Sequence, residues 1–245
     1  MSPRGGSTKG RVVVGPSPSQ RERRGVGPMT TKGQERRQEI LRAARTVFED
    51  RGYVDTRVAD IVAEARVAQG TFYTYFDSKE AVFAELSQLV VEDMLSSLRA
   101  ERVTGTPLER VTIGLRRFIN AFRPHAVFIG LIEQVGTYTP EMADMRLALR
   151  EAFVERSARG IQHMQDEGEA DAAIDAHMTA EVLGAMVDQT CYIWFSLGKD
   201  FDEDEVLGAL SSVWARAIGL DTAGLHTGGL GTGGLGTAGL DAAGA

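Results

Sequence analysis

The chain has 245 residues, of which 43% are hydrophobic and 25% charged, and its formal net charge is −7. This composition is typical of a soluble globular protein that is long enough to bury a substantial core. The longest apolar run, residues 126–132, is far shorter than the roughly 20 residues that cross a bilayer. The single cysteine, Cys191, excludes an intramolecular disulfide and a cysteine-based zinc cluster. We therefore expect a cytoplasmic protein without membrane contact, and no residue pattern calls for a cofactor or metal.

Charge is unevenly distributed along the chain. Residues 1–37 hold nine Arg or Lys and two Glu, a net charge of +7, so the rest of the chain carries −14. A basic head on an acidic body favours a polyanion partner for one end of the molecule. A solvated basic tail explains the same pattern equally well.

Both ends of the chain have a biased composition. Residues 1–33 are rich in Gly, Pro, Ser and Arg and show no hydrophobic period, which predicts a disordered basic tail. Because Met29 opens an ordinary N-terminal segment, we expect residues 1–28 to be an optional extension. Residues 222–241 form four pentads that contain a Gly-x-Gly-x-x-Gly pattern at 229–234. No strand precedes the pattern and no helix follows it, so we expect a flexible Gly-rich tail over 220–245 and no dinucleotide site.

The predicted elements between these tails are all helical. An amphipathic helix over about 34–51 ends at Gly52, and a short helix capped by Thr56 follows. The turn 66–69 leads to a second short helix over 70–76, and Asp77 or Ser78 caps a long helix that ends near residue 99. Helical periodicity continues over about 106–123, 126–138, 140–167, 176–197 and 203–218. We predict an all-α fold, with a three-helix helix-turn-helix domain over 34–80 and a six-helix domain for ligand binding and dimerisation over 81–219.

The segment 70–76, GTFYTYF, is unusually aromatic for a chain with 7% aromatic residues. On a helical wheel Phe72 and Phe76 point the same way, which predicts that both belong to the core. The opposite side carries small and polar residues with two flanking tyrosines. A short helix of this kind is suited to contact a partner while it packs against its supports.

The segment 56–67, TRVADIVAEARV, followed by GTFYTYFDSKE at 70–80, resembles the DNA-binding domain of TetR-family transcriptional regulators. The resemblance covers about residues 34–85. It implies phosphate contacts from the residues Thr56, Arg57, Tyr73, Tyr75, Lys79, Arg36 and Arg37, with Lys32 beside them. It also implies base-edge contacts from Gln69, Thr71 and Thr74, and a close backbone approach at Gly70. The family usually has Gly where this chain has Arg66 and often Ser or Thr where it has Ala68. We therefore expect either a left-handed Arg66 or a different turn, and a recognition helix without a capping hydroxyl.

The larger half contains Met and aromatic residues that suit an adaptable apolar cavity, although at helical spacing such residues more often belong to the plain core. The candidate ligand-binding residues are Phe118, Phe122, His125, Phe128, Met142, Met145, Met186 and Trp194, with Tyr192 and Phe195 beside them. The last two long helices have apolar faces that fit a four-helix bundle with a second copy, which predicts a homodimer.

These expectations combine into one function. We expect a DNA-binding repressor that leaves a palindromic double-stranded operator when it binds a small hydrophobic effector, such as a fatty acyl thioester or a drug-like molecule. A helical enzyme and an interaction module that does not read sequence are the alternatives. The chain has no HExxH, GxSxG or P-loop pattern, and its four histidines are scattered, which disfavours the enzyme.

Overall fold

The computed structural model describes residues 30–99, 104–138 and 140–220, and every element in these ranges is helical. The predictions for the remainder of both tails lie outside the described residues. The elements in chain order are α2 (Thr31–Asp55), α3 (Val58–Glu64), α4 (Gln69–Tyr75), α5 (Lys79–Leu98), α6 (Pro107–Phe122), η1 (Arg123–His125), α7 (Ala126–Val135), α8 (Pro140–Asp166), α9 (Ala176–Cys191), η2 (Tyr192–Ser196) and α10 (Glu203–Ala217). None of the described helices has the length and hydrophobicity needed to cross a membrane.

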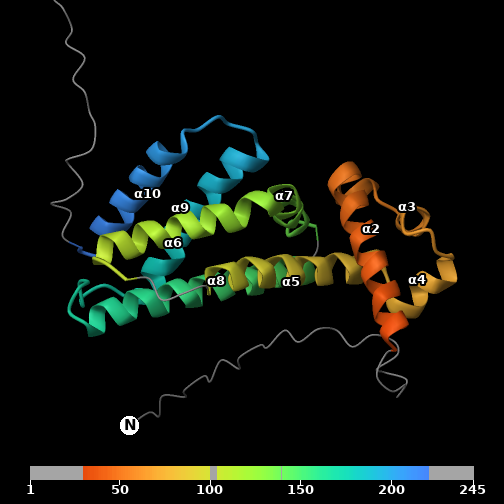
Figure 1. Cartoon of the computed structure of the whole chain (residues 1–245), viewed down its shortest axis with the longest axis horizontal. Coiled ribbons are helices and arrows are strands. Elements are labelled where there is room, and N and C mark those ends of the chain that lie inside the picture. Colours follow the sequence, from red (N-terminus) through yellow and green to blue (C-terminus); the bar gives the residue numbers. More distant parts are fainter. Residues whose placement is uncertain (1–29, 100–103, 139, 221–245) are drawn as a thin grey trace, which may run out of the picture.

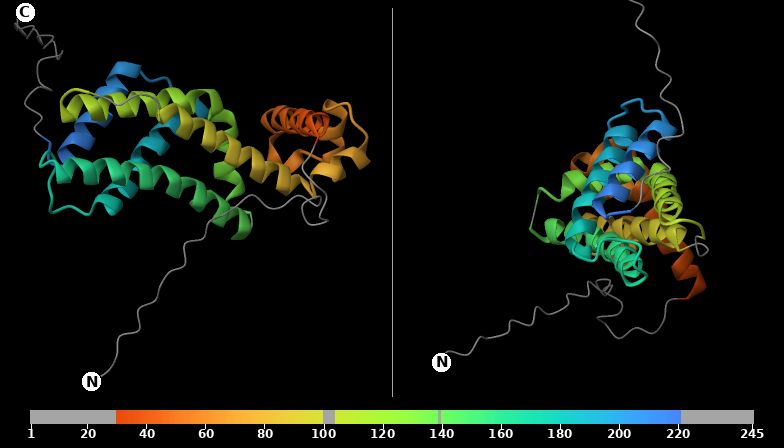
Figure 2. Two further views of the ribbon diagram at one scale, coloured as in Figure 1. Left: turned by 60° about the horizontal axis from the view of Figure 1, so that its bottom comes forward. Right: turned by 90° about the vertical axis from the view of Figure 1, so that its left-hand side faces the viewer.

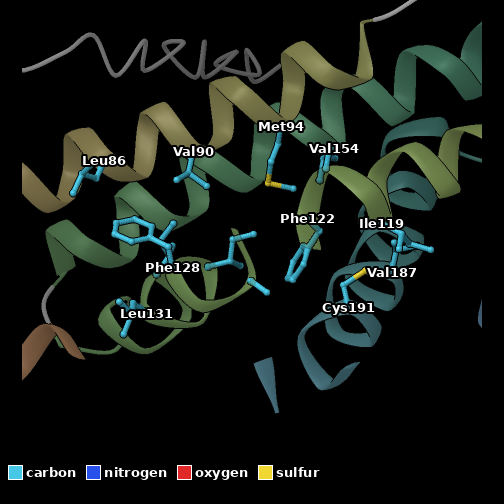
Figure 3. Close-up of a cluster of buried hydrophobic side chains, with 14 of the residues drawn as sticks. Leu86, Val90, Met94, Ile119, Phe122, Phe128, Leu131, Val154, Val187 and Cys191 are labelled. Carbon is cyan, nitrogen blue, oxygen red and sulfur yellow. The ribbon is translucent and has the colours of Figure 1, made fainter. Parts of the chain in front are cut away.

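The helices form a small head and a larger body. Helices α2, α3 and α4 make the head at one end of the long axis, and α5 leads from the head into the body formed by α6 to α10 (Figures 1 and 2). The start of α5 packs against α2, and Leu86, Val90 and Met94, further along the helix, belong to the buried hydrophobic cluster (Figure 3). Head and body therefore share one continuous hydrophobic core.

Helix α2 begins earlier than expected. The Thr30 hydroxyl accepts a hydrogen bond from the Gly33 N–H at 3.2 Å, which starts the helix at Thr31, three residues before the predicted start. The predicted tail boundary at residue 33 is wrong by the same amount. Gly52 breaks the helix as predicted: its φ of 78° lies in the left-handed region, and one further turn follows it.

Thr56 does not cap α3, and this prediction is wrong. Its side chain is only 2% exposed, and its hydroxyl donates to the Gly52 carbonyl at 2.6 Å. Arg57 occupies the position before α3, where its backbone N–H donates to the Asp60 carboxylate at 2.9 Å. Thr56 thus satisfies a carbonyl at the interrupted end of α2.

The turn between α3 and α4 has the first of the two backbones expected from the sequence. Arg66 adopts φ 53°, the one positive φ of a non-glycine residue among those described. Ala68 precedes α4 without a side-chain cap, as expected from its missing hydroxyl. Two devices that favour this turn in other sequences, a glycine and a capping hydroxyl, are therefore absent here.

The body helices differ from prediction mainly at their ends. The expected 176–197 helix stops at Cys191 and widens into the π-helical turn η2, after which Gly198 takes φ 72°. Likewise the expected 106–123 and 126–138 helices meet in the 3-10 turn η1, which contains Pro124. Ser78, one of the two predicted caps, accepts the Ala81 N–H at 3.2 Å and starts α5.

The left-handed Arg66 generates a stability prediction. A side chain at this φ costs about 1 kcal/mol or more, of which part is offset because glycine is more flexible in the unfolded chain. We expect Arg66→Gly to stabilise the protein by about 0.5–1 kcal/mol, seen as a rise of roughly 1–4 °C in Tm. Arg66→Val, which is β-branched, should lower Tm. An unchanged or lower Tm for Arg66→Gly would show that the turn stores no strain.

Candidate functional site

Helix α4 divides into two faces. Phe72 and Phe76 are buried in the core that the head shares with α5, whereas Tyr73 is 43% exposed. Gln69 and Gly70 are exposed beside it, Thr74 is exposed one turn further on, and Thr71 is half-buried. The predicted division into a core face and a polar outer face is therefore present.

The outer face is partly fixed by contacts within the head. The Tyr73 ring packs edge-on against Phe72, with centroids 5.3 Å apart, while Tyr75 is half-buried against the core. The Thr74 hydroxyl donates to the Gly70 carbonyl at 3.0 Å, so its oxygen is left to accept hydrogen bonds from a partner. No atom lies within 4 Å of a Cβ placed on Gly70, so this end of α4 is open.

Lys79 has a different role from the one expected. Its ammonium donates to the carbonyls of Tyr53 at 2.8 Å and Thr56 at 2.9 Å, and it lies 4.4 Å from the centre of the Tyr53 ring. These acceptors belong to the end of α2 and the loop after it, where carbonyls lack helical partners. Lys79 therefore ties α5 to α2, and the prediction of an ammonium directed at phosphate is wrong for this structure. Thr56, with its buried hydroxyl, is likewise not available for the phosphate contact expected of its side chain.

The two arginines predicted near the start of α2 form ion pairs within the chain. Arg37 forms a two-pronged pair with Glu85 of α5, and its guanidinium lies 4.9 Å from the centre of the Phe76 ring. Arg36 pairs with Glu39 on the same helix. Arg57 is exposed at the start of α3. Of these three arginines, Arg57 is exposed, whereas Arg36 and Arg37 are half-buried.

His125 lies at the junction of head and body, and its predicted place among the ligand-binding residues is wrong. It is buried, its Nε2 lies 2.9 Å from Asp93 of α5, and its Nδ1 lies 3.2 Å from the Arg45 guanidinium of α2. Because Arg45 can only donate, Nδ1 accepts and the imidazole is neutral with its proton on Nε2. Arg45 also donates to the Pro124 carbonyl at 3.3 Å. Arg45, His125 and Asp93 therefore connect α2 with η1 and α5.

A cavity of about 620 Å³ lies within the body, between α5, α6, α7, α8 and α9. Phe118 and Phe122 of the predicted set line it. The other six predicted ligand-binding residues, which do not line this cavity, are His125, Phe128, Met142, Met145, Met186 and Trp194. Phe128 packs in the core 5.2 Å from Phe83, and Trp194 stacks on Phe195 at 4.4 Å. Large apolar side chains pack in the core because their volume fills the space between helices. For these six residues the predicted place in the cavity lining is therefore wrong.

The cavity-lining residues that were not predicted from the sequence are mostly small, aliphatic or cationic. Aliphatic side chains from α5, α6 and α7 form much of the wall, and α8 adds a run of residues at helical spacing, namely Arg146, Leu149, Arg150, Phe153, Ser157, Gly160 and Met164. This run is one face of α8, so its period was a signal in the sequence. The arginines on this face made it resemble a solvent-exposed face, although it also carries Phe153 and Met164.

Charged groups at one side of the cavity form a network across three helices. Arg146 of α8 pairs with Glu133 of α7, and Arg150 of α8 pairs with Glu181 of α9 at 3.2 Å and reaches Asp188 at 4.0 Å. Burial, with the nearby Glu133 charge, raises the pKa of Asp188 to about 6. Burial also raises the pKa of Cys191, one turn further along α9, to about 12, so its thiol is an inert part of the core.

One group among the described residues has ligand atoms close enough for a metal ion. Glu151, His177 and Glu181 place one such atom each within 4.8 Å of one another. Arg150 already engages the Glu181 carboxylate, which balances its charge without a metal.

These features define a class: a helix-turn-helix protein whose second short helix carries an exposed polar face, joined to a helical body with a ligand-sized cavity. Residues 40–86 match the family described as "Bacterial regulatory proteins, tetR family". Residues 111–219 match the one described as "Transcriptional regulator EthR, C-terminal domain".

Individual proteins agree with these matches. The chain is 29% identical over 199 residues to the HTH-type transcriptional regulator EthR of Mycobacterium tuberculosis, covering 80% of this chain and 92% of that protein. It is 30% identical over 157 residues to the HTH-type regulator YfiR of Bacillus subtilis, covering 59% and 73%. The solved structure of Salmonella enterica GusR, 20% identical, shares the fold with a TM-score of 0.66 over 77% of this chain and 98% of that one. The chain belongs to the TetR family of DNA-binding transcriptional regulators, and it is a regulator rather than an enzyme.

The raised pKa of Asp188 predicts how stability changes with pH. The folded-state pKa of about 6 exceeds the ordinary value of 3.8, so ionisation opposes folding, and stability falls as pH rises from about 4 to 6. Asp188→Asn should remove this loss. We expect the Tm of the variant to equal the wild-type Tm near pH 4 and to exceed it by about 2–4 °C above pH 6, or roughly 1 kcal/mol after solvent screening. A pH-independent difference would contradict this assignment.

Proposed function

We propose that this protein is a homodimeric, ligand-responsive repressor that acts in the cytoplasm and leaves a palindromic operator when a small hydrophobic molecule fills its cavity. Residues 34–80 would read DNA, and residues 81–219 would bind the effector and form the dimer. The observation that carries the proposal is the division of α4, where Phe72 and Phe76 anchor a helix whose opposite face is polar and exposed.

The exposed face of α4 supports specific roles in DNA recognition. Gln69 presents an amide that can pair with adenine, and the Thr71 methyl can meet the thymine methyl in the major groove. Thr74, whose proton is used internally, would accept from adenine N6 or cytosine N4. Tyr73 and Arg57, at the edges of this face, would bind phosphate. These contacts replace the ones predicted for the side chains of Thr56 and Lys79.

Helices α9 and α10 support dimer formation. Val182 of α9 and Val213 of α10 are 62% and 46% exposed, and Met178, one turn before Val182, is also exposed. Residues four apart share a helix face, so Met178 and Val182 form an apolar stripe on α9, and Val213 adds an exposed apolar side chain on α10. A second copy with the same stripe would bury it in a four-helix bundle and would place two α4 helices on successive turns of DNA.

The effector would act by differential affinity. A ligand that binds equally well to the DNA-bound and free arrangements shifts nothing, so release requires the cavity to prefer the free arrangement. Helix α5 supports such coupling because Lys79 and Arg37 tie it to α2, while Met94 and Leu98, further along it, line the cavity.

The direct test is an electrophoretic mobility shift with the fragment upstream of the protein's own gene, at low salt. We expect a discrete shift that survives an excess of unrelated duplex. The proposal would be refuted if the folded, dimeric protein bound neither this fragment nor the fragments upstream of the adjacent genes more tightly than unrelated DNA.

Two substitutions on α4 should have different effects. Tyr73→Phe removes one hydroxyl at a phosphate and should weaken binding about equally for the operator and for base-substituted operators. Thr71→Ala removes the methyl group that would meet the thymine methyl and should lower the preference for the native base at one position in each half-site. Fluorescence anisotropy across a panel of single-base variants measures both. Identical selectivity profiles for the two variants would contradict these roles.

The dimer interface has a matched test. Val182→Glu combined with Val213→Glu places charge on the apolar stripe and should give monomers by light scattering, with loss of operator binding. Val127→Glu, at a residue 56% exposed on α7, controls for exposed apolar surface and should leave the dimer intact. A double variant that remains dimeric would place the interface elsewhere.

A further inference from the structure

The wall of the cavity combines two chemistries. Its interior is aliphatic and aromatic, with buried contributions such as Met94, Leu98 and Phe122. Its lining also includes six arginines but only two acids, Glu133 and Asp188. Each guanidinium on an otherwise apolar wall needs a partner, either a carboxylate of the protein or a group on a ligand.

At least four of the six arginines form ion pairs within the protein. Arg110 pairs with Glu169, Arg146 with Glu133, and Arg150 with Glu181. Each joins two elements of the body, which explains these three arginines as structural ties. Arg159 pairs with Glu155 on its own helix at 3.5 Å, and Arg156 of α8 remains to be explained.

Arg156 is different. Its guanidinium donates to the Leu98 carbonyl at the end of α5, and the Leu98 side chain lines the cavity. In the part of the chain that the structure describes, no carboxylate forms an ion pair with Arg156. Partial burial and then the positive charges of Arg159, Arg99 and Arg117 lower the pKa of Arg156. Positive charge is therefore concentrated at the place where the apolar wall reaches the surface.

We propose that the effector is an amphipathic anion whose acidic head group binds Arg156 and its neighbours at the rim, and whose apolar chain enters the cavity. This rests on the proposed role of the cavity as the effector site. An arginine fork binds a carboxylate or a phosphate through two parallel hydrogen bonds, and an anion here relieves the repulsion within the cluster. Burial of the chain against the wall supplies the apolar part of the affinity.

The cavity has room for such a chain. Its volume of about 620 Å³ lies within the usual range for sites that hold a drug-sized ligand. Gly114 of α6 and Gly160 of α8 both line it, and a Cβ on either would meet no atom within 4 Å. The absence of side chains at these two positions keeps the space between α6 and α8 open.

The test is isothermal titration calorimetry of the intact dimer with three probes of one chain length: laurate, dodecan-1-ol and lauroyl-coenzyme A. We expect at least one of the two anions to bind ten-fold or more tightly than the neutral alcohol. If laurate binds, a carboxylate suffices as head group; if lauroyl-coenzyme A alone binds, the phosphates of the carrier supply the charge.

Variants separate the head-group site from the chain site. Arg156→Gln should reduce anion affinity to that of the alcohol without lowering Tm, whereas Arg156→Lys should retain part of the anion preference. Gly114→Leu should weaken anion and alcohol alike by occupying the chain site. Arg216→Gln removes an exposed arginine of α10 outside the cavity and should change nothing.

Equal affinity for acid and alcohol, no binding of either anion, or an Arg156→Gln variant that binds as the wild type would overturn the inference. The operator shift, measured on the same preparation without ligand, tests the proposed function separately. A protein that shifts its operator but binds no anion refutes the anion site alone. One that binds the anion through Arg156 but shifts no DNA refutes the regulatory role and leaves the site standing.

Discussion

Phe83 packs edge-on against Phe48 of α2 and stacks on Phe128 of α7, in both cases with ring centroids 5.2 Å apart. One side chain of α5 thus joins the head to the body. The polar ties around it act on the same elements: Lys79 holds the end of α2, and Arg45 holds His125 beside α7. Because interiors are close-packed, α5 cannot tilt without repacking this cluster. The orientation of α4 therefore depends on contacts that lie outside the head.

The same helix explains how a cavity in the body could influence DNA binding. Met94 and Leu98 stand on the cavity wall three and four turns beyond Phe83. A ligand that changes the packing of these residues acts on a rigid element whose other end carries the ties to α2. Two alternative packings of α5 would differ by only a few kcal/mol, which is within the range that differential ligand binding supplies.

Local sequence patterns predicted the helices and the two faces of α4. Helical spacing alone places Phe72 and Phe76 on the same side of the helix, so residues within a few positions of one another carry this information. The left-handed Arg66 was one of two outcomes that the comparison with the family's usual glycine left open. Thr56 and Lys79 were misassigned because their partners are backbone carbonyls released by the break at Gly52, which side-chain patterns do not reveal. The cavity lining was not predicted for a similar reason, since the cavity is the space between faces of several helices. In a linear sequence its arginines are indistinguishable from solvent-exposed charges.

Whether a pair of α4 helices reads DNA sequence can be measured by selecting binding sites from a random duplex pool with the purified protein. A dimer of this kind should enrich a motif of two inverted half-sites, with centres one helical turn or more apart. Recovery of duplexes without a shared motif, or of a single unrepeated half-site, would contradict this expectation.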